Sequence, residues 1–108
     1  MNTFESLRTV FNPHSIALVG VSNRPGSVGN ALLRNTLGGD FNGVVYPVNP
    51  KHRSMRGSKV YPTLTAIPDP VDLAIIATPA AQVPGVIEEC GKCGIGNAVV
   101  ITAGFLES

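Results

Sequence analysis

The chain has 108 residues, of which 44% are hydrophobic and 14% are charged, and its formal net charge is +1. This length fits one domain, and the near-neutral charge gives no reason to expect a surface for nucleic acid or anionic membranes. The start of the chain lacks the basic segment of a secretory signal, so we expect a cytoplasmic protein whose two cysteines are reduced.

The first half of the chain predicts a helix, a strand, a second helix and a second strand. Residues 4–11 carry apolar side chains at helical spacing and predict a short helix. Residues 15–21 predict a buried strand, which leads through a glycine-rich loop into a helix over residues 28–37. Residues 44–48 predict the second strand, and Pro47 predicts a twist or local irregularity in it because proline has no backbone N–H.

The second half of the chain predicts three further strands. The expected elements are a short strand over residues 59–61, a helical turn over 64–67, a buried strand over 71–77, an amphipathic helix over 83–93 and a strand over 97–102. Strands that alternate with helices through short connections form right-handed βαβ units. We therefore predict an α/β fold: a Rossmann-like, doubly wound parallel sheet of about five strands in the order 3-2-1-4-5, with its ligand at the carboxyl ends of the first and fourth strands.

The loop between the first strand and its helix has the character of a phosphate site. Gly20, Gly26 and Gly29 fall between a buried strand and a helix start, where unpaired backbone N–H groups and the helix dipole favour an anion. The spacing is not that of the usual dinucleotide fingerprint, and glycines that serve only a tight turn remain an alternative. Ser27 is placed to cap the helix, to contact a phosphate oxygen, or to do both.

The end of the second strand narrows the choice of ligand. An NAD site needs an acidic residue about 20 positions beyond the loop, to bind the ribose hydroxyls. This chain instead has Lys51, His52 and Arg53 there. Basic side chains favour a ligand whose ribose carries a phosphate, either NADP or coenzyme A. A solvated basic turn without a ligand is the other interpretation.

Five motifs in register resemble the CoA-binding domain of NDP-forming (ADP-forming) acyl-CoA synthetases. They span residues 11–29, 46–51, 71–79, 88–91 and 99–105, and so extend over nearly the whole chain. Similar domains begin the succinyl-CoA synthetase alpha subunit and the acyl-CoA-synthetase-like protein lysine acetyltransferases. Five ordered motifs are much more specific than a glycine pattern, so the resemblance favours coenzyme A or acyl-CoA over NADP.

The resemblance implies roles for the matching residues. The phosphates of coenzyme A would contact Ser22, Pro25, Gly26, Ser27 and Val28. Lys51 would pair with phosphate at the nucleotide end. Ala77, Thr78 and Pro79 would line the path of the adenine and the pantetheine, and Thr102, Ala103 and Gly104 would lie beside the thiol arm.

The resemblance also implies that binding and catalysis lie on different domains. In the full synthetases a phosphohistidine domain and an ATP-grasp domain lie outside this region, so residues 1–108 are expected to be one N-terminal CoA-binding domain that binds without catalysis. The parent would be an acid–CoA ligase (ADP-forming) or an acetyltransferase, and its other domains or subunits would be the partners. The alternatives are an NADP-binding domain of an oxidoreductase and a regulatory nucleotide-sensing module.

The pair Cys90 and Cys93 has the spacing of a redox or zinc motif. One pair supplies only two metal ligands, and both cysteines continue the apolar stripe of the predicted helix. We therefore predict that they pack in the core, and we assign no metal ligand and no catalytic residue.

Overall fold

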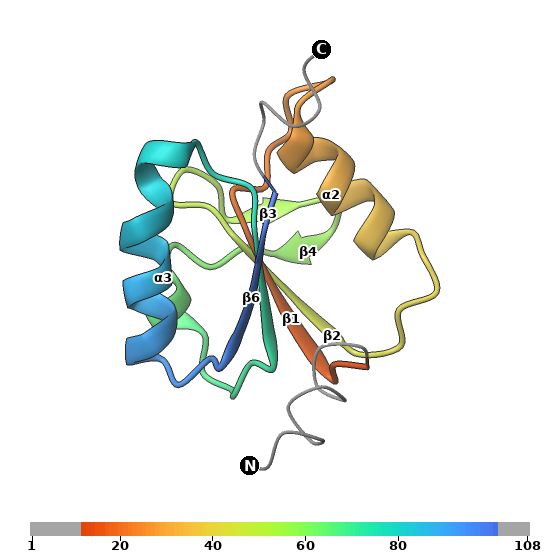
Figure 1. The fold of residues 1–108 in the computed structure, drawn as a ribbon. Coiled ribbons are helices and arrows are strands. Elements are labelled where there is room, and N and C mark those ends of the chain that lie inside the picture. Colours follow the sequence, from red (N-terminus) through yellow and green to blue (C-terminus); the bar gives the residue numbers. More distant parts are fainter. Residues whose placement is uncertain (1–11, 102–108) are drawn as a thin grey trace.

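The computed structural model describes residues 12–101, along which strands and helices alternate (Figure 1). The strands are β1 (Ser15–Val19), β2 (Val44–Val48), β3 (Ser54–Met55), β4 (Ser58–Lys59), β5 (Leu73–Ile76) and β6 (Asn97–Val100). The helices are α2 (Val28–Leu37) and α3 (Val83–Lys92), with single 3-10 turns η1 (Leu64–Ala66) and η2 (Ala80–Gln82). The helix predicted over residues 4–11 lies outside the described residues.

Four parallel strands form the central sheet in the order β2-β1-β5-β6. They correspond to the second, first, fourth and fifth predicted strands, so the predicted α/β fold and the order of these four strands are confirmed. The chain moves from β1 to β2 on one side and then returns to place β5 on the other side of β1. The order of the strands therefore reverses between β1 and β5, which is where ligands bind in open α/β sheets.

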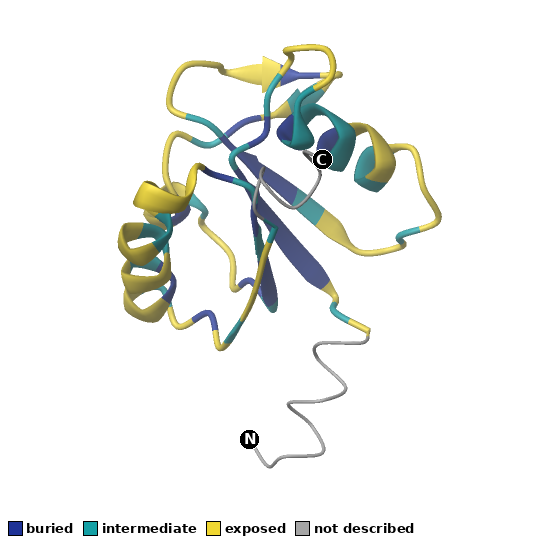
Figure 2. Ribbon diagram, turned by 45° about the horizontal axis from the view of Figure 1, so that its top comes forward, coloured by how far each residue is buried: buried dark blue, intermediate teal, exposed yellow. Residues whose placement is uncertain are grey.

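Figure 1 shows α2 and α3 on opposite sides of the sheet. Along β1, Ile16 and Leu18 pack in one cluster with Leu33 of α2. The alternate residue, Ala17, packs in a second cluster with Cys90 of α3. Because each face has its own core, β1 is buried at every position, as Figure 2 shows in dark blue.

The predicted third strand is only partly correct. Ser58 and Lys59 belong to a small antiparallel hairpin, β3–β4, and only Tyr61 reaches the sheet, through a single parallel bridge to Val48. Tyr61 N–H donates to the carbonyl oxygen of Pro47, and Asn49 N–H donates to the carbonyl oxygen of Tyr61, each at 2.9 Å. Pro47 has no backbone N–H, so a longer strand paired along this edge of β2 would lack one hydrogen bond.

The local irregularity predicted at Pro47 is absent from the pairing of β2 with β1. β2 keeps an unbroken register with β1, and Pro47 lies opposite Leu18. The carbonyl group of Pro47 faces Tyr61, on the side of β2 away from β1. The backbone N–H that proline lacks would point to the same side, away from β1. A proline at this position therefore removes no hydrogen bond between β2 and β1.

Candidate functional site

A cleft of about 380 Å³ opens at the carboxyl ends of β1, β2 and β5. It is lined by residues 19–21 after β1, residues 48–51 after β2, Pro62 and Thr63, residues 77–79 after β5, and Gln82, Val86 and Glu89 at α3. Of the predicted site residues, Lys51, Ala77, Thr78 and Pro79 meet in this cleft. The structure thus brings together residues from the second and fourth predicted strands at the predicted edge of the sheet.

The glycine-rich loop adjoins the cleft but does not line it. The lining on this side ends at Val21, and the loop continues from Ser22 into α2. Ser27 caps α2: its Oγ accepts from Asn30 N–H at 3.1 Å and donates to the carbonyl oxygen of Arg24 at 2.8 Å. The predicted cap is therefore confirmed, while the N–H groups of Val28 and Gly29 have no acceptor among the described residues.

The three loop glycines have different roles. A Cβ atom on Gly20 would lie 2.7 Å from the carbonyl carbon of Ala77, and a Cβ atom on Gly29 would collide with the carbonyl oxygen of Gly20. These two glycines allow backbones to pack closely. Gly26 also has a positive φ, 81°, but a Cβ atom there would have no atom within 4 Å. Only Gly26 leaves open space above the loop for a ligand.

Asn49 connects the two turns that border the cleft, and the sequence analysis did not identify it. Its Nδ2 donates to the carbonyl oxygen of Val21 at 2.8 Å, and its Oδ1 accepts from Lys51 N–H at 2.7 Å. The second bond is an Asx turn, for which asparagine followed by proline was the available sequence signal. The bond to Val21 has no local sequence signal.

Thr78 carries the most unusual polar group of the cleft. The residue is 7% exposed, and its hydroxyl oxygen is buried with no hydrogen-bond partner among the described residues. A buried hydroxyl without a partner costs about 1–3 kcal/mol. Its position in the lining of the cleft makes Thr78 a candidate contact for a polar ligand atom.

Glu89 is a second lining residue that the sequence analysis did not assign to the site. Its Oε1 accepts from the backbone N–H of Leu64 at 2.9 Å, so it holds the first residue of η1 against α3. Lys51 and Glu89 lie on different walls of the cleft, one after β2 and the other on α3. The lining of the cleft therefore carries one basic and one acidic side chain from different elements.

Three predicted site residues, Thr102, Ala103 and Gly104, lie outside the described residues. In the sequence they come after Ile101, the residue that follows β6, and β6 pairs in parallel with β5.

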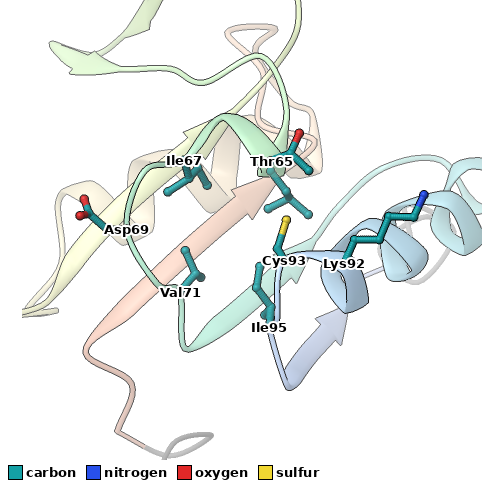
Figure 3. A pocket seen from close by; sticks show the side chains of 8 residues that line it. Thr65, Ile67, Asp69, Val71, Lys92, Cys93 and Ile95 are labelled. Atoms are coloured by element: carbon teal, nitrogen blue, oxygen red, sulfur yellow. The ribbon is translucent and has the colours of Figure 1, made fainter.

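A smaller pocket of about 210 Å³ lies between η1 and the end of α3. Figure 3 shows Cys93 and Ile95 facing the segment that carries Thr65, Ile67 and Val71. Cys90 is 3% exposed and belongs to the core, with Cys93 packed against the same cluster. Burial raises the pKa of both thiols, which disfavours the thiolate that redox chemistry or metal binding needs. The predicted packing role of the two cysteines is confirmed.

Within residues 12–101, no helix is long and apolar enough to cross a membrane.

Comparison with known proteins identifies the family. Residues 14–107 match the family model described as a CoA binding domain. The chain is 46% identical over 101 residues to an acetate–CoA ligase (ADP-forming) of Methanocaldococcus jannaschii, covering 94% of this chain and 14% of that protein. It is 42% identical to the alpha subunit of acetate–CoA ligase (ADP-forming) I of Pyrococcus furiosus, covering 94% of this chain and 23% of the subunit.

A solved structure also resembles this chain. An acetyl-coenzyme A synthetase of Ca. Korarchaeum cryptofilum, in complex with phosphate and ADP, superposes with a TM-score of 0.86 and 48% identity. The match covers 92% of this chain and 21% of that chain, so this chain spans about a fifth of the protein it matches. These matches confirm the predicted family and coenzyme A as the ligand that the family description names. The chain belongs to the CoA binding domain family.

Proposed function

We propose that this chain is the coenzyme A-binding domain of a larger ADP-forming acyl-CoA synthetase and that the cleft after β1, β2 and β5 receives the ligand. The observation that carries the proposal is the cleft itself, which lies at the reversal of strand order and joins Lys51 to residues 77–79. The buried, unpartnered hydroxyl of Thr78 supports it, because a bound ligand would supply the missing partner.

The charged side chains that line the cleft favour one orientation of bound coenzyme A. Coenzyme A has an anionic nucleotide end, with a 3′-phosphate and a pyrophosphate, and an uncharged pantetheine arm. Its nucleotide end would lie toward Lys51 and away from the carboxylate of Glu89. The uncharged arm would then pass the wall formed by residues 77–79 and α3.

The glycine-rich loop would receive the pyrophosphate. Ser22, Pro25, Gly26, Ser27 and Val28 surround the start of α2, where the free N–H groups of Val28 and Gly29 and the helix dipole favour an anion. Thr102, Ala103 and Gly104 would accompany the thiol end, beyond the carboxyl end of β6. Lys51 would bind the 3′-phosphate.

The chemistry would belong to other parts of the parent protein. The described residues contain no group of three or more His, Cys, Asp or Glu side chains that could hold a metal ion. We propose an ATP-grasp domain and a phosphohistidine domain, in the same chain or in a partner subunit, as the sites of phosphoryl transfer. A longer gene product with both domains would support a synthetase, and a fused acetyltransferase domain in their place would contradict it.

The binding proposal is tested by calorimetry with coenzyme A, acetyl-CoA, 3′-dephospho-CoA, NAD and NADP. Coenzyme A is expected to bind more tightly than either dinucleotide and about fivefold more tightly than 3′-dephospho-CoA, as for one exposed charge pair of about 1 kcal/mol. The variant Lys51→Met keeps the aliphatic stem and should lose the preference for the 3′-phosphate. Lys92→Met is the matched control, because Lys92 is exposed on α3 and pairs with Glu88. Tighter binding of NADP would overturn the proposal.

A further inference from the structure

Asn49 uses both ends of its carboxamide inside the protein. Its Nδ2 holds the carbonyl oxygen of Val21, the last lining residue before the glycine-rich loop. Its Oδ1 holds the backbone N–H of Lys51. Its own backbone N–H donates to Tyr61, so the residue itself is anchored to the bridge at the edge of β2. One side chain therefore connects the turn after β1 with the turn after β2.

The hydrogen bond from Lys51 N–H to Asn49 fixes the backbone that carries the exposed Lys51 side chain. Lys51 is exposed, and a lysine loses about 2 kcal/mol of rotamer freedom when it is held in one place. The entropy that an exposed ammonium group loses when it binds a phosphate is lowered by a fixed backbone. Within the described residues, the Asx turn made by Asn49 is the side-chain bond that fixes it.

We propose that Asn49 is a positioning residue for coenzyme A, which sets the distance between the glycine-rich loop and Lys51 and thereby creates the preference for the 3′-phosphate. This inference rests on the proposed function and names the residue on which its specificity depends. Asn49 acts through Lys51 and the Val21 turn. Its removal should therefore abolish a preference between two ligands, not merely weaken binding.

Asn30 provides the matched control. Its Nδ2 donates to the carbonyl oxygen of Ser22 at 3.1 Å, the next carbonyl along the same loop, and among the described residues its side chain makes no hydrogen bond to the Lys51 turn. Asn30→Ala removes a carboxamide of the same kind from the same loop. It should weaken the binding of coenzyme A and 3′-dephospho-CoA equally and leave the ratio of their Kd values unchanged.

The experiment measures both Kd values by calorimetry for the unmodified chain, Asn49→Ala, Lys51→Met and the double variant. The unmodified chain should prefer coenzyme A by about fivefold, and Asn49→Ala should reduce this ratio to below about twofold. Lys51→Met should then have no further effect on the ratio in the Asn49→Ala background, because both substitutions remove the same discrimination.

A second variant keeps the inference testable if Asn49→Ala fails to fold. In Asn49→Ser the hydroxyl can still accept from Lys51 N–H, as in an ST turn, but it is too short to reach Val21. This variant should retain part of the preference for the 3′-phosphate while binding both ligands more weakly.

The outcomes separate the two proposals. Failure of the unmodified chain to bind coenzyme A would count against the proposed function. A fivefold preference that survives in Asn49→Ala, or effects of Asn49→Ala and Lys51→Met on the ratio that simply add, would overturn the role of Asn49 and leave the proposed function standing.

Discussion

A Cβ atom placed on Gly20 would lie 2.8 Å from the backbone nitrogen of Thr78. Gly20 follows β1 and Thr78 follows β5, so the two turns that leave the neighbouring central strands touch through their backbones. Gly20 has a φ of 94°, in the left-handed region that favours glycine. Both residues line the cleft.

Gly20→Ala is expected to destabilise the fold strongly. The new methyl group would meet the backbone of Ala77 and Thr78, and the positive φ would add strain, for a combined loss of about 2–4 kcal/mol. Chemical denaturation measures the free energy of unfolding. Gly91→Ala is the control, because Gly91 lies in α3 with open space around it and should gain about 0.5–1 kcal/mol. A loss at Gly20 below about 0.5 kcal/mol would contradict the close contact.

Gly26→Val is expected to abolish binding of coenzyme A with a modest loss of stability. The side chain would occupy the open space above the loop, where the phosphates are proposed to lie. Gly57→Val is a close control, because Gly57 has a φ of 80° against 81° for Gly26 and equally open surroundings, but lies in the β3–β4 turn. Both variants should lose about 1–3 kcal/mol of stability through backbone strain. Calorimetry should find lost affinity only at Gly26, and equal affinities would mean that the loop is merely a turn.

The β3–β4 hairpin is expected to accelerate ligand association. Four of the eight lysine and arginine residues lie between residues 41 and 68, a stretch without any acidic residue. The hairpin follows Lys51 and precedes Pro62, both of which line the cleft. Its positive charge should therefore attract the anionic coenzyme A toward the site.

The double variant Arg53→Gln, Arg56→Gln should lower the association rate by about threefold at low salt, with little change in the dissociation rate. Stopped-flow kinetics at several ionic strengths measure both rates. Arg34→Gln is the control, since Arg34 lies in the last turn of α2. Steering by the hairpin would be excluded if the double variant kept the association rate of the unmodified chain. It would also be excluded if the association rates of both proteins did not change with ionic strength.

Tyr46 is expected to make stability depend on alkaline pH. Its hydroxyl donates to Asp69 Oδ2 at 3.0 Å, and burial, together with this carboxylate, raises the pKa of the phenol above its usual 10.0. In the unfolded chain the phenol ionises at the lower, usual pKa. The contribution of Tyr46 to the free energy of unfolding should therefore be constant well below pH 10 and fall as the pH rises toward the raised pKa.

Tyr46→Phe should lose about 1 kcal/mol at pH 7, through the missing hydrogen bond, and should fall less steeply above pH 10. Asp69→Asn keeps an acceptor for the hydroxyl but removes the charge, so its alkaline decline should be intermediate. Urea denaturation between pH 7 and 11 measures these slopes. Identical slopes in the unmodified chain and Tyr46→Phe would contradict the raised pKa of Tyr46.

Elements with a strong local signal were predictable from the sequence. The helix over residues 28–37 and the strand over 44–48 have the observed bounds, because periodic apolar residues and terminal glycines define them locally. The third strand was only partly predictable. Lys59 and Tyr61 have strand-like neighbours, but the pairing of Tyr61 depends on the edge that Pro47 offers.

The fold class was predictable without the structure, as were the strand-loop-helix unit after β1, the basic turn at Lys51 and, through ordered motifs, the coenzyme A-binding family. These features depend on residue type and spacing within single segments. Other features depend on how distant segments meet in the fold. Gly20 and Gly29 allow close packing, while Gly26 stays open. Asn49 donates to the carbonyl oxygen of Val21, 28 positions away, and Glu89 accepts from Leu64 N–H, 25 positions away. The reason is physical: a backbone collision or a hydrogen bond between distant segments exists only after the strands have paired, and no local pattern encodes it.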